Sequence, residues 1–145
     1  MSARKVKIDD ISNEINKIMK EYSSDVTSVM MKDIDSVARQ TVNKVKEKAP
    51  VRKGTANRHY KGSGKSYPPG TYKNSWGSKV TEQSATRKNR TVYSKGQGSL
   101  THLLENGHAS RYGGRVKAIP HIKEAEEYAV NELVTRLKRR IEHGL

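Results

Sequence analysis

The 145-residue sequence contains no cysteine, no phenylalanine and a single tryptophan. Without cysteine, the chain can form neither a disulfide framework nor a thiolate metal site, and it has no cysteine nucleophile. Hydrophobic residues make up 32% of the chain, which is less than the usual share in a globular protein. The length suits a single domain, 1–145, with a modest core. The low apolar content predicts that this domain completes its burial against other subunits.

Long apolar runs are also missing. No run approaches the roughly 18 to 20 residues that a membrane span requires. The basic start, Met1 to Lys7, is not followed by the apolar segment of a signal peptide. We therefore expect a soluble protein that is made in the cytoplasm and has no membrane partner.

The residues that would assemble an active site are lacking as well. There is no G-x-S-x-G elbow and no second carboxylate near Glu105, so a hydrolase is the weakest reading. Gly64-Lys65-Ser66 matches the end of a phosphate loop, but no apolar strand precedes it and no helix follows. His102, Glu105 and His108 are three apart, whereas zinc-binding HExxH histidines lie four apart on one helix. We predict no enzymatic activity, no cofactor and no metal.

Positive charge is abundant and unevenly distributed, with a net charge of +14. Residues 52–95 contain eleven Lys and Arg against one acid, Glu82, whereas the flanks are nearly balanced. Such a region suits either nucleic-acid phosphates or an acidic protein neighbour, and charge alone does not separate the two. A nucleic-acid-binding protein that uses region 52–95 is therefore the main alternative function, although no helix-turn-helix or zinc module is present.

Apolar residues recur every 3.7 residues on average between Ile8 and Val45, which predicts a long helix over residues 8–49. Pro50 ends it, because the residue before a proline is biased away from helix. A continuous helix of about 40 residues would span ~60 Å, longer than the ~40 Å diameter of a compact domain of this size. Either the helix kinks near Ser23, or its apolar stripe is buried against another chain.

A Gly- and Pro-rich basic stretch, 52–70, follows, and we interpret it as a mobile arm that becomes ordered against a partner. From Tyr72 the apolar period changes to two, which predicts a strand to Val80, and Arg90 to Ser94 is expected to pair with it as an antiparallel hairpin. Val116 to Ile119 is expected to add a third strand.

The predicted fold class is α+β: a long N-terminal helix, a small mainly antiparallel sheet, and a C-terminal helix packed on the sheet. The sheet region covers 72–119 and includes a short helix at 100–106. The C-terminal helix covers 120–142, where apolar residues from Ile122 to Ile141 fall on one face.

The stretch from Leu100 to Glu127 has the most distinctive pattern. Gly107 is suited to end the short helix in a left-handed conformation, and Gly113-Gly114 is suited to a turn with positive φ. Pro120 is expected at the first position of the last helix, where its missing N–H would be unpaired in any case.

Glu105 is predicted to be a buried or half-buried carboxylate that pins this turn by pairing with Arg115 or His108. His121, next to the proline, is predicted to be a packing or capping residue. Glu105, Gly107 and Pro120 together form the expected structural motif.

The motif THLLE-x-GH at 101–108, a Gly-rich turn, and RV-x-A-x-PH at 115–121 resemble the neck and tail-completion proteins of tailed bacteriophages, typified by the tenth gene product of a lambdoid coliphage. Upstream, APVRKG at 49–54 and YKNSW at 72–76 are similar to that family in weaker form. Two departures are the residues inserted at 55–70 and His121, which replaces the usual aromatic.

The resemblance implies a structural virion protein: a head-tail connector or minor tail component that forms an oligomeric ring in the neck, with sixfold symmetry. The implied partners are other copies of the chain, neighbouring head-closure, tail-terminator or tail-tube proteins, and DNA in the lumen. Assembly would take place in the host cytoplasm, and the final location would be the virion neck or tail. The candidate intersubunit contacts lie in the arm and at the tip of the turn: Arg52, Lys53, Arg58, Lys61, Lys65, His108, Arg111 and Arg115.

Overall fold

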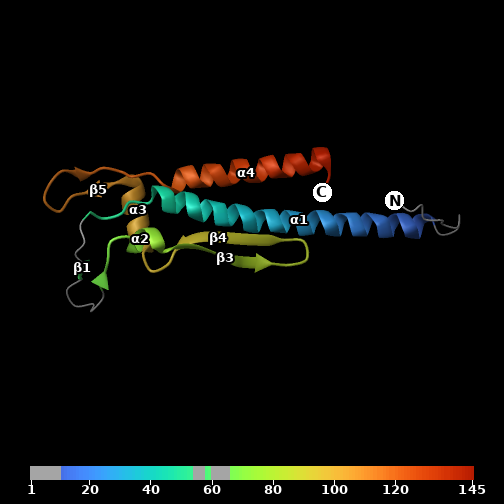
Figure 1. Ribbon diagram of the computed structural model, residues 1–145, viewed down its shortest axis with the longest axis horizontal. Coiled ribbons are helices and arrows are strands. Elements are labelled where there is room, and N and C mark those ends of the chain that lie inside the picture. Colours follow the sequence, from blue (N-terminus) through green and yellow to red (C-terminus); the bar gives the residue numbers. More distant parts are fainter. Residues whose placement is uncertain (1–10, 54–57, 60–65) are drawn as a thin grey trace.

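The computed structural model describes residues 11–53, 58–59 and 66–145. Helix α1 (Ile11–Lys48) lies in the middle, with the hairpin of β3 (Trp76–Gln83) and β4 (Lys88–Ser94) on one side and helix α4 (Ile122–His143) on the other (Figure 1). The predicted α+β class is confirmed. None of the helices in the described ranges is long and apolar enough to cross a membrane.

Helix α1 is continuous over 38 residues, so the kink considered near Ser23 does not occur. The Thr27 hydroxyl donates to the carbonyl oxygen of Ser23 at 2.8 Å within the unbroken helix. The helix ends two residues before Pro50, as the bias against helix before a proline predicts. Val37 and Val45, in its second half, are almost fully buried.

The antiparallel hairpin is confirmed, with Trp76 opposite Ser94 at its base and Gln83 opposite Lys88 at its far end. The expected start of the first strand at Tyr72 is wrong, because Thr71–Asn74 forms the short helix α2. Tyr72 lies in α2 and Trp76 begins β3, and their rings pack edge-on with centroids 5.9 Å apart. Both residues are buried.

The expected third strand of this sheet is also wrong. After α3 (Gly98–Asn106), strand β5 (His108–Ala109) pairs with β6 (Arg115–Val116), and the two form a separate two-stranded hairpin. The Ile119 N–H donates instead to the carbonyl of Leu104 in α3, at 2.7 Å. In the arm, β1 (Arg58–His59) pairs with β2 (Ser66–Tyr67) as a third small ladder.

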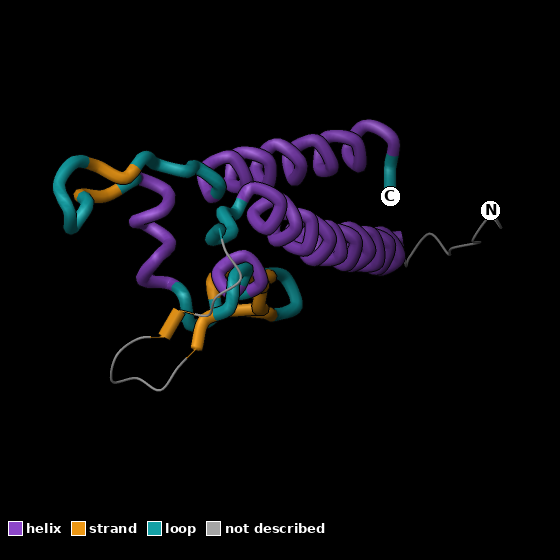
Figure 2. The backbone as a smooth tube through the Cα atoms, turned by 60° about the vertical axis from the view of Figure 1, so that its left-hand side comes forward, coloured by secondary structure: helices purple, strands orange, loops and turns teal. Residues whose placement is uncertain are grey.

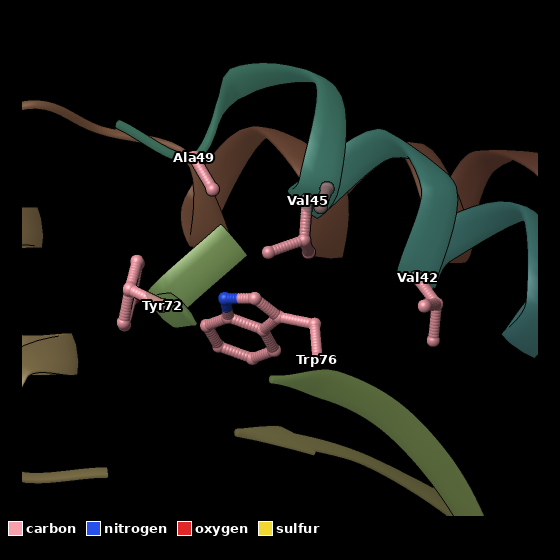
Figure 3. Close-up of a cluster of buried hydrophobic side chains, with 6 residues drawn as sticks. Val42, Val45, Ala49, Tyr72 and Trp76 are labelled. Atoms are coloured by element: carbon pink, nitrogen blue, oxygen red, sulfur yellow. The ribbon is translucent and has the colours of Figure 1, made fainter. Parts of the chain in front are cut away.

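The core lies where the layers meet, and Figure 3 shows its buried side chains. Its members come from α1 and the residue after it, and from α2, β3 and α4: Val42, Val45, Ala49, Tyr72, Trp76 and Ala125. Ile122 packs against the same cluster, as does Val92 of β4. The expected packing of the C-terminal helix against the sheet region is thus confirmed at the first turn of α4, and the rest of α4 runs along α1 (Figures 1 and 2).

Candidate assembly surfaces

The structural motif around Glu105 is built at the start of α4. One oxygen of its carboxylate accepts the backbone N–H groups of His121 and Ile122 at 2.8 and 3.0 Å, and the other accepts that of Lys123 at 3.0 Å. The first N–H groups of a helix have no partner within the helix, so a carboxylate from α3 satisfies them and also suits the positive end of the helix dipole. Glu105 therefore caps α4 from a distance.

This geometry corrects two predictions. Glu105 pairs with the start of α4 and with the His121 ring, whose Nδ1 lies 3.2 Å from its carboxylate, and not with Arg115 or His108. Pro120 lies one residue before the cap, because His121 occupies the cap position and α4 begins at Ile122. Burial favours the neutral form of Glu105, but the three N–H groups and the His121 ring outweigh it and hold the pKa of the carboxyl below its usual range.

His121 is fully buried and ties the motif to the core, as its predicted packing role requires. Its Nδ1 lies 2.7 Å from the carbonyl oxygen of Ile119, which can only accept, so Nδ1 carries a proton and donates it. Its Nε2 lies 2.7 Å from the Tyr72 hydroxyl, which donates to it when the ring is neutral. The imidazole packs edge-on against the rings of Tyr72 and Trp76. Burial raises the pKa of Tyr72, so its hydroxyl keeps its proton.

Gly107 joins α3 to β5 with φ of 71° and ψ of 170°. The positive φ is as predicted, although the ψ is extended and not that of a left-handed helical residue. A side chain could not fit there, because a Cβ on Gly107 would lie 2.6 Å from the carbonyl oxygen of Val116 and 2.9 Å from the nitrogen of Ala118. The glycine thus lets α3 pass directly against the strand that returns from the hairpin.

The tip of the β5–β6 hairpin is a fixed turn. Gly113 and Gly114 have φ of 92° and 76°, as predicted, and the Ser110 N–H donates to the Gly114 carbonyl at 3.0 Å. The Ser110 hydroxyl accepts the N–H of Tyr112 at 3.2 Å. The turn displays Tyr112, whose side chain is 94% exposed, at one end of the molecule (Figures 1 and 2).

The structure separates the predicted tip residues. Arg111 and Arg115 are exposed on either side of Tyr112, where a partner could reach them. His108 is half-buried at the base of the hairpin, with its Nδ1 3.4 Å from the carbonyl oxygen of Leu103, so it supports the hairpin from inside. Tyr112 was missed by sequence reading, although an aromatic residue next to Gly-Gly was the available signal.

The arm residues are only partly described. Arg52 and Lys53 are exposed, and an Nη of Arg52 donates to the carbonyl of Tyr67 at 3.4 Å. Arg58 lies in β1, and its side chain is outside what the structure describes; Lys61 and Lys65 lie outside the described residues altogether. The β1–β2 ladder lies toward the same end of the molecule as the β5–β6 hairpin (Figure 1).

Part of the basic region 52–95 is neutralised within the molecule. Lys88 and Arg90 on β4 both bind Asp35 of α1, at 2.6 and 2.9 Å, and Arg87 lies 3.3 Å from Glu82. The Lys88 hydrogen bond, with the charges of Lys88 and Arg90, outweighs burial and lowers the pKa of Asp35. Asp35 lies outside region 52–95, so the count of acidic residues in that region of the sequence does not include it.

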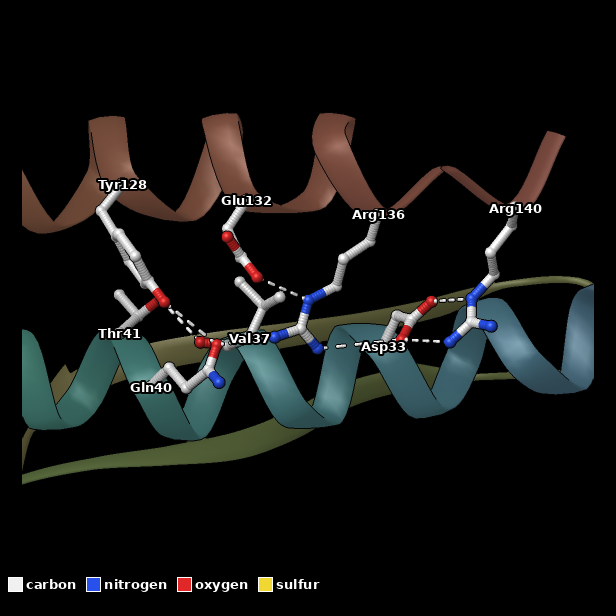
Figure 4. A network of polar contacts seen from close by, with 8 residues as sticks. All are labelled: Asp33, Val37, Gln40, Thr41, Tyr128, Glu132, Arg136 and Arg140. Atoms are coloured by element: carbon white, nitrogen blue, oxygen red, sulfur yellow. Dashed lines mark hydrogen bonds and ion pairs between the residues drawn. The ribbon is translucent and has the colours of Figure 1, made fainter. Parts of the chain in front are cut away.

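A polar network joins α1 to α4 along their length (Figure 4). The guanidinium of Arg140 makes two bonds to Asp33, of 2.6 and 3.0 Å, which lower the pKa of that carboxyl against the effect of burial. Gln40 accepts from Arg136 at 2.9 Å and from the Tyr128 hydroxyl at 3.1 Å. The basic end of the last helix therefore has a specific partner in addition to the helix dipole.

Two apolar surfaces have no cover among the described residues. The first half of α1 carries four side chains that are each at least half exposed: Ile15, Ile18, Met19 and Tyr22. Helix α4 carries another exposed row: Val130, Val134, Leu137 and Ile141. An apolar groove, with Asp33 at its edge, lies between the two helices and is lined by Met30, Ile34, Leu133, Val134 and Leu137.

Within the ranges that the structure describes, no group of three His, Asp or Glu side chains is placed to hold a metal ion. Comparisons of the chain with protein-family profiles, with curated proteins and with solved structures found no match.

Proposed function

We propose that the chain is a structural virion protein of the neck of a tailed bacteriophage, where it forms an oligomeric ring that completes the tail or joins it to the head. The observation that carries this proposal is the uncovered apolar stripe on the first half of α1. The last contact between α4 and α1 in the polar network is at Asp33. The 22 residues of α1 before it are roughly 33 Å long, and the amino-terminal turns of this segment extend past α4 and the β3–β4 hairpin (Figure 1).

The pattern on this segment is that of a helix that packs against other helices. Ile15, Ile18 and Tyr22 recur at spacings of three and four residues, which places them on one face. Contiguous exposed apolar side chains on a protein surface mark interaction sites, whereas single ones are ordinary. Other copies of the chain or a neighbouring neck protein would cover this face.

The motifs of the resemblance support the same proposal from the sequence. Their residues converge on one structural unit, in which Glu105 caps α4, Gly107 admits the returning strand and the Gly113-Gly114 turn displays the tip. These residues build and orient a projecting hairpin, which is a scaffolding role. We propose that the chain has no enzymatic activity, that it is assembled in the host cytoplasm, and that it is located in the virion.

Nucleic-acid binding through region 52–95 is the alternative. The ion pairs of Lys88 and Arg90 with Asp35 and of Arg87 with Glu82 leave less charge available for phosphates than the sequence count suggests. The alternative predicts DNA affinity that falls steeply with salt. Titration of purified protein with duplex DNA at two salt concentrations measures this.

The deciding experiment is deletion of the reading frame from its parent genetic element, followed by electron microscopy of induced lysates. We expect filled heads that accumulate apart from tails, or tails of abnormal length. A plasmid-borne copy of the intact gene is the control and restores normal particles. Normal, infectious particles from the deletion would contradict the proposal.

A further inference from the structure

We propose that the β5–β6 hairpin of one copy docks, through Tyr112 and its flanking arginines, on the acidic hollow of α4 in the next copy. The hollow is lined by Glu126, Glu127, Val130 and Asn131. This inference rests on the proposed ring, since it names the two surfaces that would meet between neighbouring subunits.

The tip is positively charged and preorganised. Residues 106–123 contain four bases and no acid. Arg111, Tyr112 and Arg115 are exposed on a turn that the Ser110 bonds and two glycines hold. A side chain displayed by a fixed turn loses little conformational freedom on binding. Tyr and Arg are also the residues that most often anchor interfaces.

The hollow on α4 has the opposite character. Residues 124–132 contain four acids and no base. Two of the acids are engaged, since Glu124 pairs with Lys48 and Glu132 with Arg136. The other two, Glu126 and Glu127, are exposed and have no partner in the part of the chain that the structure describes.

Val130 adds an exposed apolar side chain beside these carboxylates, and the residue is 56% exposed. A tyrosine ring placed on this valine would bury apolar surface, while the two arginines face the two glutamates. Guanidinium and carboxylate groups form paired hydrogen bonds with well-defined geometry. The two surfaces therefore match in both charge and chemistry.

The two surfaces of one chain point in different directions. Figures 1 and 2 both show the hairpin extending beyond the amino-terminal end of α4, away from the body of that helix. The tip thus meets the hollow of another copy. In the proposed ring, the tip of each copy meets the hollow of the next, so the contact is head-to-tail, and head-to-tail contacts close into rings or continue as filaments.

The absence of cysteine from the chain permits a direct test. In the full-length protein, Tyr112→Cys combined with Val130→Cys introduces the only two thiols. If the tip reaches the neighbouring hollow, mild oxidation joins them between copies, since a disulfide requires Cα atoms within about 7 Å. We expect a ladder of covalent species beyond the dimer on a non-reducing gel. Each single-cysteine variant is the matched control and gives at most a dimer.

Charge reversal tests the partner. In the double-cysteine background, Arg111→Glu with Arg115→Glu should abolish the ladder, and adding Glu126→Arg with Glu127→Arg should restore it. All four positions are exposed, so thermal melts should be unchanged. Failure of the second pair to restore the ladder would overturn the assignment. If Arg111→Glu with Arg115→Glu abolishes DNA binding, and Glu126→Arg with Glu127→Arg does not restore the ladder, the tip binds nucleic acid instead.

The outcomes also separate this inference from the proposed function. Oligomers of the cysteine-free protein whose mass by ultracentrifugation is unchanged by Arg111→Glu with Arg115→Glu would overturn the tip-to-hollow contact and leave the ring proposal standing. Normal particles from the deletion would reject the proposed function whether or not the ladder forms.

Discussion

Glu105 joins parts of the chain that are 16 to 18 residues apart, and it does so with a single carboxylate. Its three backbone donors belong to consecutive residues at the start of α4, and its position is fixed by the end of α3. The hairpin that displays Tyr112 leaves and returns between these two elements. The carboxylate therefore closes the base of the hairpin, and substitutions of Glu105 should affect both the stability of the protein and the tip of the hairpin.

Replacing Glu105 with Gln should lower the free energy of unfolding by about 1–2 kcal/mol, because an amide oxygen cannot serve three N–H donors as a carboxylate does. Glu82→Gln, at an exposed carboxylate on β3, is the matched control and should cost about 0.5 kcal/mol or less. Urea unfolding followed by circular dichroism measures both. An unchanged midpoint for Glu105→Gln, with normal assembly, would reject the capping role.

The effect of Glu105→Gln on the free energy of unfolding should depend on pH. The pKa of Glu105 is lower in the folded chain than its ordinary value, so its contribution is present at neutral pH and is lost as pH falls through the folded pKa. The difference between wild type and Glu105→Gln should therefore shrink as pH falls from about 5 toward 2, a window set by the ordinary carboxyl pKa near 4.3. A difference that is independent of pH would show that the lost charge is not the cause.

Gly107→Ala should destabilise the protein by roughly 3 kcal/mol or more, because its positive φ with an extended ψ is a backbone region that costs other residues about 1–3 kcal/mol, and the Cβ clash with backbone costs about 1–3 kcal/mol. Gly96 is the matched control because it has the same φ of 71°, and a Cβ added there would meet nothing within 4 Å. Gly96→Ala should show only the smaller backbone cost. Equal losses in the two variants, measured by chemical unfolding, would rule out the close approach of Val116 as a cause.

At the residue scale, predictions from the sequence were correct where a residue's conformation has a local cause. The positive φ of Gly107, Gly113 and Gly114 follows from glycine in a turn. The partners of Glu105 were predicted wrongly because they depend on where the chain returns after the hairpin. The charge of Arg115 made it a plausible partner. In the fold, however, the returning strand places backbone N–H groups at the carboxylate. The pattern of side chains in the sequence does not indicate such backbone contacts.

At the scale of elements, α1 was predictable and α2 was not. The 3.7-residue period over 37 residues identifies a long helix, and a terminating proline fixes its end. In contrast, Tyr72 and Asn74 continue the strand alternation of the residues from Trp76 onward, yet they lie in helix α2. A four-residue helix is too short to show a helical period, so the alternation concealed it.

The exposed stripe of α1 should act in assembly more than in folding. The triple variant Ile15→Gln, Met19→Gln and Tyr22→Gln should reduce the oligomer mass measured by sedimentation. The unfolding free energy of the monomer should change by no more than about 0.5 kcal/mol, because all three side chains are at least half exposed.

Lys17→Gln with Lys20→Gln, at exposed polar positions on the same turns, is the matched control and should leave the mass unchanged. An unchanged mass in the triple variant would show that this stripe is not an interface.

At the scale of the whole molecule, three acids hold the layers of a strongly basic protein together. Asp33 joins α1 to α4, Asp35 joins α1 to β4, and Glu105 joins α3 to α4. The pKa of each carboxyl is lowered in the fold. Each therefore stabilises the fold above its ordinary pKa, and that stability is lost as pH falls through the folded value.

Acid should consequently loosen all three junctions together. We expect the near-ultraviolet circular dichroism of Trp76 and Tyr72 to decrease between about pH 4 and pH 2, while the helical far-ultraviolet signal persists longer. Asp33→Asn should already weaken the α1–α4 junction at pH 7 and show less change on acidification. A near-ultraviolet spectrum that is constant down to pH 2 would contradict this account.

The order of the layers could not be predicted from the sequence. The sequence predicted that the last helix packs on the sheet. This packing is present at Ala125 and Ile122, but most of α4 lies on α1. Asp33 and Asp35 are two residues apart and face α4 and β4 respectively. Their partners could not be assigned from the chain, since many bases were available and only the tertiary fold selects among them.

The central position of α1 also has a consequence for the newly made chain. Arg140, which binds Asp33, lies 107 residues later in the sequence. At a synthesis rate of about 5–20 residues per second, α4 leaves the ribosome roughly 5–20 seconds after the part of α1 that it covers. Until then the nascent helix presents Val37 and its neighbours without their final cover. Among the described elements, the helix around which the fold is organised is thus made first, and its burial is completed only when the last helix has been made.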